Sequence, residues 1–243
     1  IGCEHFSTPG SVRLKHRNYY GAYTVYERDN VVVLEHGRTV HGRQFATGER
    51  VSVPLSYYHY AAPLGSWLVS ARSGLTDVGM VGLGSGALVA YFGEGQSFQL
   101  YELDPDNEWI AREHFSYLAQ AEARGLELAL HTGDGRRSLD AAPRDSLDLL
   151  VIDAFGGDAI PVHLLTVEAF DTYLRVLRPE GVLAIHVSNN LFDLPPVVFA
   201  VAAVHRLPAV YGQGPSGDHP EADFSQWMLL SRDRAVIERL QRN

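Results

Sequence analysis

The sequence has a single cysteine, Cys3, so it cannot form an internal disulfide framework, and this favours a reducing compartment such as the cytoplasm. No apolar stretch approaches the ~18 residues that a membrane-spanning helix needs. Basic residues are also scarce. The chain carries 20 Lys and Arg against 29 Asp and Glu, and its charge of −9 argues against a nucleic-acid partner while suiting a small cationic ligand.

The sequence also has no recognisable pattern of metal-ligating residues. The 11 histidines include His36 and His41, but their spacing fits no zinc template and no cysteine supports them. We therefore predict no metal site.

What the chain does contain is typical of a globular protein. Its 243 residues are 46% hydrophobic and 20% charged, enough for one domain or for one domain with a small appendage. The chain begins at Ile1 rather than at a methionine, so we expect it to be part of a longer protein.

Two regions of different periodicity divide the chain. Residues 1–55 include short β-branched and aromatic runs between Tyr19 and Val53, which predict a small β-hairpin region. Residues 56–243 alternate strand-like and helix-like segments, which predicts a parallel sheet with crossover helices. The expected fold is α/β, a doubly wound, Rossmann-like sheet of the seven-stranded methyltransferase type, with strands near 78–82, 97–102, 126–131, 147–153, 181–187, 208–212 and 226–231.

The clearest helix signal follows the second of these strands. Asp104 is suited to be its N-cap, Pro105 its first residue and Gly125 its end. Its expected apolar side is formed by Trp109, Ile110, Phe115 and Leu118.

A glycine-rich loop follows the first strand of this region. In VGMVGLGSGA, residues 78–87, the glycines Gly82, Gly84 and Gly86 precede an expected helix and would let the backbone approach a ligand closely. Glu102 ends the next strand, twenty positions after Gly82, where a carboxylate can accept both hydroxyls of a ribose. A nucleoside ligand is therefore predicted. The loop also fits the dinucleotide pattern with Ala87 in the last place, so NAD remains an alternative.

Two more carboxylates stand at predicted strand ends. Asp134 lies between two glycines in HTGDGRR, and Asp153 ends the apolar run of VIDAFGGDAIP. Asp153 alone is equally suited to a turn or a helix cap, and Asp134 alone is best explained by a simple Asp-Gly turn. Together with Glu102 they place three acids at one edge of the sheet, where ligands of open α/β sheets bind.

The ordered motifs VGLGSG, YELDP, HTGDG and VIDAF resemble the spermidine synthase (aminopropyltransferase) family over about residues 15–231. The stretches LEHGRTVHGRQ, PLSYYH, DAFGGDAIPVHLLT and HVSNN resemble more closely the bacterial subgroup in which such a domain is fused to a membrane region.

The resemblance implies a role for each matching position. Decarboxylated S-adenosylmethionine would lie on the glycine loop, residues Gly82, Gly84, Ser85 and Gly86, with its ribose on Glu102 and its adenine near Asp134 and Gly135. Asp153 matches the catalytic aspartate. On the substrate side the matching or neighbouring residues are Gln44, Tyr58, His59, Phe155 and Asp158.

Several positions depart from the family pattern. Ser85 takes the place of a loop aspartate that holds the aminopropyl amine, and Tyr60 replaces the glutamate of YHE. Asp158 lies further from Asp153 than the family's second loop aspartate does. Ordinary methyltransferases carry an acidic residue two positions before the first loop glycine, and here that position is Met80.

These observations predict an enzyme, a homo-oligomeric aminopropyltransferase that moves the aminopropyl group of decarboxylated S-adenosylmethionine to a polyamine acceptor. The co-substrate is expected to be exchanged, with no tightly bound cofactor. Two alternatives remain open: a methyltransferase that uses S-adenosylmethionine, and a non-catalytic nucleoside-sensing domain of a larger membrane protein at the cytoplasmic face of the membrane.

Overall fold

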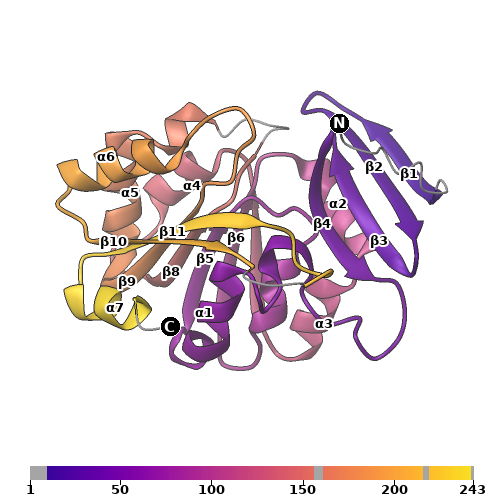
Figure 1. Cartoon of the computed structure of the whole chain (residues 1–243), viewed down its shortest axis with the longest axis horizontal. Coiled ribbons are helices and arrows are strands. Elements are labelled where there is room, and N and C mark those ends of the chain that lie inside the picture. Colours follow the sequence, from indigo (N-terminus) through magenta and orange to yellow (C-terminus); the bar gives the residue numbers. More distant parts are fainter. Residues whose placement is uncertain (1–9, 156–160, 216–218, 242–243) are drawn as a thin grey trace.

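The computed structural model describes residues 10–155, 161–215 and 219–241. Within these ranges no helix is both long and apolar enough to cross a membrane. The chain forms two sheets, one of four strands near the N-terminus and one of seven strands, as the sequence predicts (Figure 1).

The seven-stranded sheet has the strand order β10-β11-β9-β8-β5-β6-β7. Strands β9, β8, β5, β6 and β7 are parallel, whereas β11 is antiparallel to both β9 and β10. The central strands are near-continuous apolar runs because both faces of the sheet are covered. Their bounds are β5 Asp77–Val81, β6 Ser97–Glu102, β7 Glu127–Thr132, β8 Leu147–Ile152, β9 Leu177–His186, β10 Ala209–Gly214 and β11 Ser225–Ser231.

Helices cover the two faces of this sheet in separate groups. One face packs against α1 (Pro63–Ala71), α3 (Tyr117–Ala123), α7 (Arg234–Leu240) and the short 3-10 helix η3 (Ala87–Tyr91). The other face packs against α4 (Gly135–Ala141), α5 (Val167–Val176) and α6 (Pro195–Val204). The sheet is therefore doubly wound, and its carboxyl edge is left open for a ligand.

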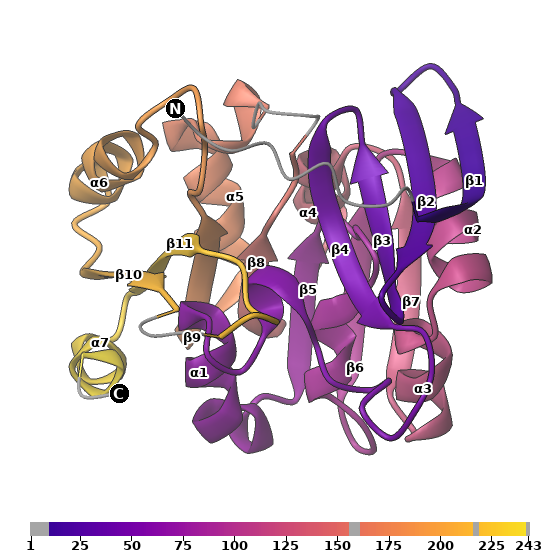
Figure 2. The same ribbon diagram turned by 45° about the vertical axis from the view of Figure 1, so that its right-hand side comes forward.

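The four-stranded sheet is antiparallel, in the order β1-β2-β3-β4, and lies beside the carboxyl edge of the large sheet (Figure 2). Its strands are β1 Ser11–Arg17, β2 Ala22–Arg28, β3 Val31–His36 and β4 Thr39–Phe45. Its apolar face packs on α2 (Pro105–His114) in a small cluster formed by Tyr23, Val25, Val32, Leu34, Ile110 and Phe115. The boundary expected at residue 55 falls between β4 and the short 3-10 helix η1 (Ser56–Tyr58).

The single helix predicted after Asp104 is two helices, which corrects the sequence interpretation. The Asp104 side chain caps α2 as expected, by accepting a hydrogen bond from the Asp106 amide. Phe115, however, has extended backbone angles, and α3 starts afresh at Tyr117. Ile110, Phe115 and Leu118 are buried as predicted, but Trp109 is 47% exposed and does not belong to the apolar side.

Candidate functional site

The first feature of the site is the junction of β5 and β8, where the order of the parallel strands reverses. The Asp153 amide donates to the Val81 carbonyl at 2.9 Å, so the segments that follow β5 and β8 start next to each other. Gly82 has φ +96°, and a Cβ built on it would lie 2.1 Å from the Asp153 carbonyl oxygen. Only glycine fits there, and the glycine loop and Asp153 are thereby held in contact.

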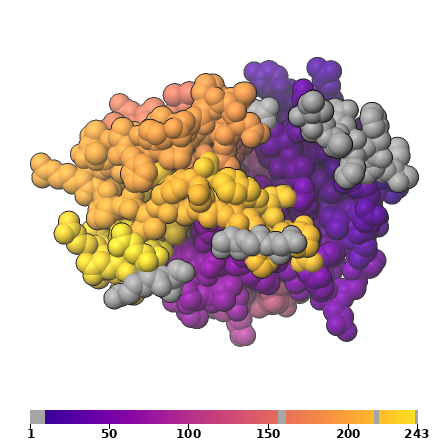
Figure 3. Space-filling model, in the orientation of Figure 1, coloured from indigo at the N-terminus to yellow at the C-terminus, as the bar shows by residue number. Residues whose placement is uncertain are grey.

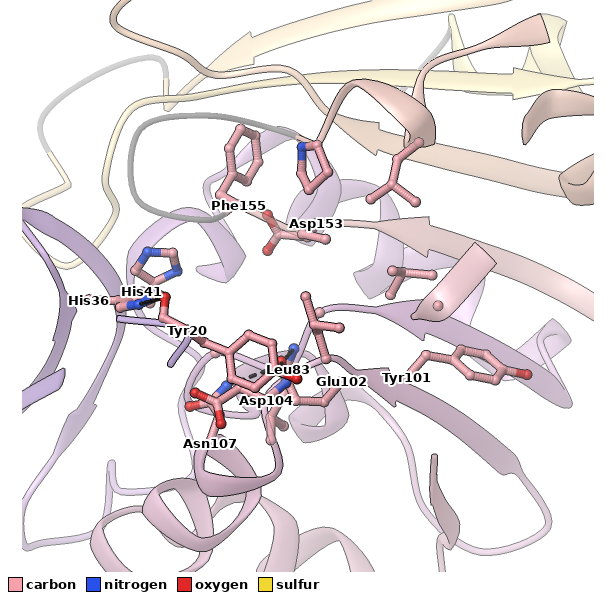
Figure 4. A pocket seen from close by; sticks show the side chains of 18 of the residues that line it. Tyr20, His36, His41, Leu83, Tyr101, Glu102, Asp104, Asn107, Asp153 and Phe155 are labelled. Carbon is pink, nitrogen blue, oxygen red and sulfur yellow. Dashed lines mark hydrogen bonds between the residues drawn. The ribbon is translucent and has the colours of Figure 1, made fainter. Parts of the chain in front are cut away.

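Strand β4 of the small sheet is in close contact with the glycine loop. Leu34 of β3 pairs with Gly42 of β4 and Glu35 pairs with Val40, so His41 is the extra residue of a β-bulge. A bulge redirects a side chain, and His41 points into the site from the small sheet (Figure 4). Gly42 approaches Ser85 so closely that a Cβ would lie 2.0 Å from the serine Oγ.

A pocket lies between these elements, over the glycine loop, and we call it the glycine-loop pocket. Figure 4 shows Asp153 and Phe155 on one side of it, His36 and His41 on another, and Glu102, Asp104 and Asn107 together on a third. Asp134, Gly135 and His163 also line it. The three strand-end acids predicted from the sequence thus meet in one pocket. Among the described residues lining it there is no lysine or arginine.

Glu102, the last residue of β6, lines the glycine-loop pocket and accepts several hydrogen bonds. It accepts bonds from the Leu83 amide at 2.9 Å, the Asp104 amide at 2.9 Å and the Asn107 side chain at 3.0 Å. Burial raises the pKa of Glu102 above its ordinary value, because these neutral donors only partly offset the loss of water. Glu102 therefore also holds the glycine loop in place.

Asp134 serves two structural partners at the rim of the pocket. It is the N-cap of α4, accepting from the Arg137 amide at 3.0 Å, and its other oxygen lies 3.2 Å from Nε2 of His163. Gly135 packs on Val81, where a Cβ would lie 2.5 Å from a valine methyl. In place of the simple Asp-Gly turn considered for it, Asp134 caps a helix, and the same side chain lines the pocket.

Asp153 is almost fully buried, with 5% of its side chain exposed. Its Oδ1 accepts from Nδ1 of His186 at 2.7 Å, and its Oδ2 accepts from the Tyr58 hydroxyl at 2.5 Å. Burial alone would raise the pKa of Asp153, but the adjacent His186 imidazole and these hydrogen bonds outweigh it and lower the pKa below its ordinary value. Asp153 is thus a persistent anion and a weak base.

A second pocket opens on the other side of Asp153, and we call it the Ser188 pocket. It shares His41, Asp153 and Phe155 with the glycine-loop pocket. Its remaining lining comes from Thr39, Val40, Tyr57, His186, Ser188, Asn189, Asn190, Asp223 and Phe224. Two compounds bound in the two pockets would therefore meet at Asp153.

Several predicted site residues do not line either pocket. Gln44 is 2% exposed and bonds to Ser116 and to the Val51 carbonyl instead. Ser85 is 2% exposed and faces Gly42, and Gly86 packs on Leu118.

The pair Tyr58 and His59 is also displaced from the expected place. Tyr58 supports Asp153 from behind, and His59 lies 3.7 Å from Glu221 and beside His219. The neighbouring Tyr57 lines the Ser188 pocket in their place. Asp158 lies outside the described residues.

Sequence reasoning missed residues that only the fold brings to the site. His41 gave no signal because a bulge cannot be placed without the partner strand. Asn107 lies in the first turn of α2 and reaches back to Glu102. His186 ends β9, contacts Asp153 and lines the Ser188 pocket.

Comparison with known proteins places this arrangement in context. No family model matches the chain. A polyamine aminopropyltransferase from Vibrio vulnificus is 29% identical over 121 residues, which is 47% of this chain and 39% of the relative. The match therefore spans well under two thirds of the curated relative's length.

Solved structures extend the likeness over nearly the whole chain. The spermidine synthase of Thermotoga maritima aligns with a TM-score of 0.68 and 15% identity, over 94% of this chain and 75% of the other. A probable spermidine synthase of Corynebacterium glutamicum aligns with a TM-score of 0.67 and 15% identity, over 97% of this chain and 87% of the other. The similarity to the spermidine synthase family that the motifs predict is therefore confirmed, in sequence by the curated relative and in fold by these structures.

Proposed function

We propose that this chain is an aminopropyltransferase that moves the aminopropyl group of decarboxylated S-adenosylmethionine to an amine. The observation that carries the proposal is the pair of pockets that meet at Asp153. The glycine-loop pocket suits the nucleoside, and the Ser188 pocket suits the acceptor. A spermidine synthase of the same fold has been solved with the transition-state analogue AdoDATO, which supports the choice of co-substrate.

The charge of the glycine-loop pocket supports a cationic nucleoside. Glu102, Asp104, Asp134 and Asp153 line it, and no described lining residue is a lysine or arginine. A sulfonium ion is attracted by such a site, whereas the pyrophosphate of NAD would meet carboxylates without a cationic partner. The glycine loop also continues into the five-residue 3-10 helix η3 instead of the long helix that usually receives a pyrophosphate.

The rate of aminopropyl transfer depends more on the orientation of the attacking amine than on stabilisation of the sulfonium charge. A neutral amine attacks a carbon bonded to the sulfonium, and the positive charge on sulfur disappears as the C–S bond breaks. Placing the amine in line with that carbon lowers the barrier, whereas a carboxylate beside the sulfonium mainly helps binding. Asp153 lies where both effects are needed, at the wall shared by the two pockets.

The direct test is turnover, measured as methylthioadenosine released from decarboxylated S-adenosylmethionine with putrescine, spermidine or cadaverine as acceptor. We expect Asp153→Asn to keep methylthioadenosine binding and the melting temperature nearly unchanged and to lower turnover at least ~100-fold. Asparagine can still accept from Tyr58 but carries no negative charge at the wall that the two pockets share.

Controls separate the other candidate functions. Methyl transfer from S-adenosylmethionine to any of these amines would support the methyltransferase alternative. Binding of methylthioadenosine by the wild type without turnover of any amine would support a sensing domain and contradict aminopropyl transfer.

The finer features expected from the sequence remain part of the proposal. A homo-oligomer, a cytoplasmic location and fusion to a membrane region rest on composition and on the resemblance to the membrane-fused subgroup. Light scattering of the purified protein would test the oligomer.

A further inference from the structure

Asp153, His186 and Ser188 form a continuous hydrogen-bonded chain. Oδ1 of Asp153 lies 2.7 Å from Nδ1 of His186, and Nε2 of His186 lies 2.8 Å from Oγ of Ser188. The amide of Gln226 in β11 donates to the same Oγ at 2.7 Å. This series of hydrogen bonds leads from the wall that the two pockets share into the Ser188 pocket, which both His186 and Ser188 line.

The partners fix where the protons lie. An ionised carboxylate only accepts, so Nδ1 of His186 carries a proton and donates it to Asp153. The neutral imidazole is the form that can act as a base, and in that form Nε2 has no proton and accepts from the Ser188 hydroxyl. Because the Gln226 amide occupies one lone pair of Oγ, the second lone pair is left to accept from a group in the Ser188 pocket.

The surroundings suit an imidazole that becomes charged. The His186 ring stacks on Trp227 with centroids 4.5 Å apart, lies 4.8 Å from Tyr57 and meets Phe155 edge-on at 5.2 Å. Aromatic faces stabilise a cation, and the Asp153 carboxylate pairs with it directly. Among the described residues, the other titratable groups facing this site are Tyr57 and Tyr58 from η1, His41 from β4 and Asp223, whose charge is paired with Arg43 at 2.6 Å.

We propose that His186 accepts the proton that the acceptor amine loses, that Ser188 carries this proton and that Asp153 orients the imidazole. This inference rests on the proposed function. The amine lone pair forms the C–N bond while the C–S bond breaks and its electron pair stays on sulfur. The new ammonium then gives a proton to Oγ of Ser188 as the hydroxyl gives its own proton to Nε2. The products are a thioether, a neutral secondary amine and an imidazolium paired with Asp153.

The proposal assigns different tasks to the carboxylate and the imidazole. Both Asp153 oxygens are already engaged, one by His186 and one by Tyr58. Imidazole is the side chain that ordinarily gains and loses a proton between pH 5 and 8, so it matches the task of a base at neutral pH. The connectivity is that of an Asp-His-Ser relay, used here to remove a proton and not to make a nucleophile.

The test is His186→Gln, which can still donate to Asp153 but cannot take up a proton. We expect kcat to fall at least ~100-fold, with methylthioadenosine affinity and melting temperature close to those of the wild type. The kcat–pH profile of the variant should lose the acid limb that the wild type shows. His205→Gln is the matched control, because His205 also faces a carboxylate, Asp171 at 3.7 Å, and stacks on Phe170 far from both pockets.

Ser188 provides a second, independent variant. Ser188→Ala should lower kcat without changing KM for the nucleoside, and Ser188→Thr, which keeps the hydroxyl, should restore most of it. Retention of more than a tenth of wild-type kcat by His186→Gln, with an unchanged pH profile, would overturn the relay and leave aminopropyl transfer intact. A parallel loss of nucleoside affinity and stability would show a structural role instead.

Two further outcomes keep the inference separate from the proposed function. No turnover by the wild type with any amine would overturn the proposed function and the relay together. Nitrogen-15 spectroscopy of the wild type should find the Nδ1–H tautomer of His186. In Asp153→Asn the Nδ1 proton should exchange faster with solvent, because it has lost its carboxylate acceptor. An Nε2–H tautomer with a bare Nδ1 would overturn the relay whatever the activity.

Discussion

Two buried carboxylates at this site have pKa values shifted in opposite directions. Glu102 meets only neutral donors, so burial dominates and its pKa rises, whereas Asp153 faces an imidazole that outweighs burial and its pKa falls. Their positions were predictable, because parallel strands end at one edge of a sheet. Their partners were not, since His186 is 33 residues from Asp153 and nothing local in the sequence signals the pair.

Glu102→Ala should weaken methylthioadenosine binding by roughly 1.5–3 kcal/mol, because charge-assisted bonds to the ribose are lost. It should also lower the melting temperature, because Leu83, Asp104 and Asn107 each lose an acceptor. Calorimetry and thermal unfolding measure the two effects. Glu108→Gln is the control, because Glu108 pairs with Arg112 in α2 and lines neither pocket. Unchanged affinity in a folded variant would remove Glu102 from the site, and tight NAD binding by the wild type would favour a dinucleotide.

At the scale of elements, the periodicity of the sequence located all seven strands of the large sheet but not the break between α2 and α3. The break has a tertiary cause. The Ser116 amide donates to Oε1 of Gln44, 72 residues away, at 2.8 Å. A helix that ran through this point would lose that bond, and helical propensity alone carries no trace of it.

Asp148 is the single interruption in the apolar run of β8, and its partners explain it. It accepts from the Thr76 amide at 2.7 Å, the Thr76 hydroxyl at 2.9 Å and the Asp77 amide at 2.9 Å, and it pairs with Arg178. Arg178 also reaches Asp77 at 2.7 Å. The carboxylate thus ties the amino ends of β5 and β8 to β9.

We expect Asp148→Asn to lower the free energy of unfolding by about 1–3 kcal/mol at pH 7. Burial raises the pKa of Asp148, but Arg178 and the other donors outweigh it and hold the pKa below its ordinary value. A lowered pKa stabilises the folded state above the ordinary pKa and loses this effect as pH falls through the folded-state value. The difference between wild type and variant should therefore be constant from pH 7 to about 5 and shrink below about 4.

Urea unfolding across this pH range checks the prediction. Asp145→Asn serves as the control, because Asp145 is 52% exposed and lies 3.6 Å from Arg232, so its loss should be nearly neutral at every pH. A pH-independent difference for Asp148→Asn would show that its carboxylate charge is not what stabilises the strand ends.

At the scale of the whole molecule, the site exists because the small sheet is fastened to the large domain on two sides. One side is the apolar contact of Tyr23 and Leu34 with Ile110 and Phe115 of the α2 region. The other is a pair of ion pairs, Arg43–Asp223 at 2.6 Å and Arg50–Glu221, which join β4 and the following loop to the segment before β11. Figure 3 shows the orange-yellow segment around β11 reaching the violet, N-terminal part of the chain on this face.

The sequence predicted the two regions and their composition, but not how they are joined. Docking depends on side chains that are far apart in the sequence, and the β-bulge at His41 depends on the register between β3 and β4. Gln44 shows the difference most clearly. The resemblance implies a ligand contact, whereas its amide lies between β4 and the start of α3.

Gln44→Leu therefore distinguishes the two roles of this residue. If Gln44 fastens the sheets, the variant leaves the Ser116 amide and hydroxyl and the Val51 carbonyl without its bonds, and we expect a loss of about 1–3 kcal/mol in unfolding free energy. Methylthioadenosine affinity should then fall only as far as the docking of the small sheet loosens. Because Arg43→Met breaks an ion pair of the same interface without touching Gln44, it should reproduce the same coupled pattern in denaturant melts and binding isotherms. A variant at Gln44 that kept full stability and lost the ligand would instead restore the contact that the sequence resemblance implies.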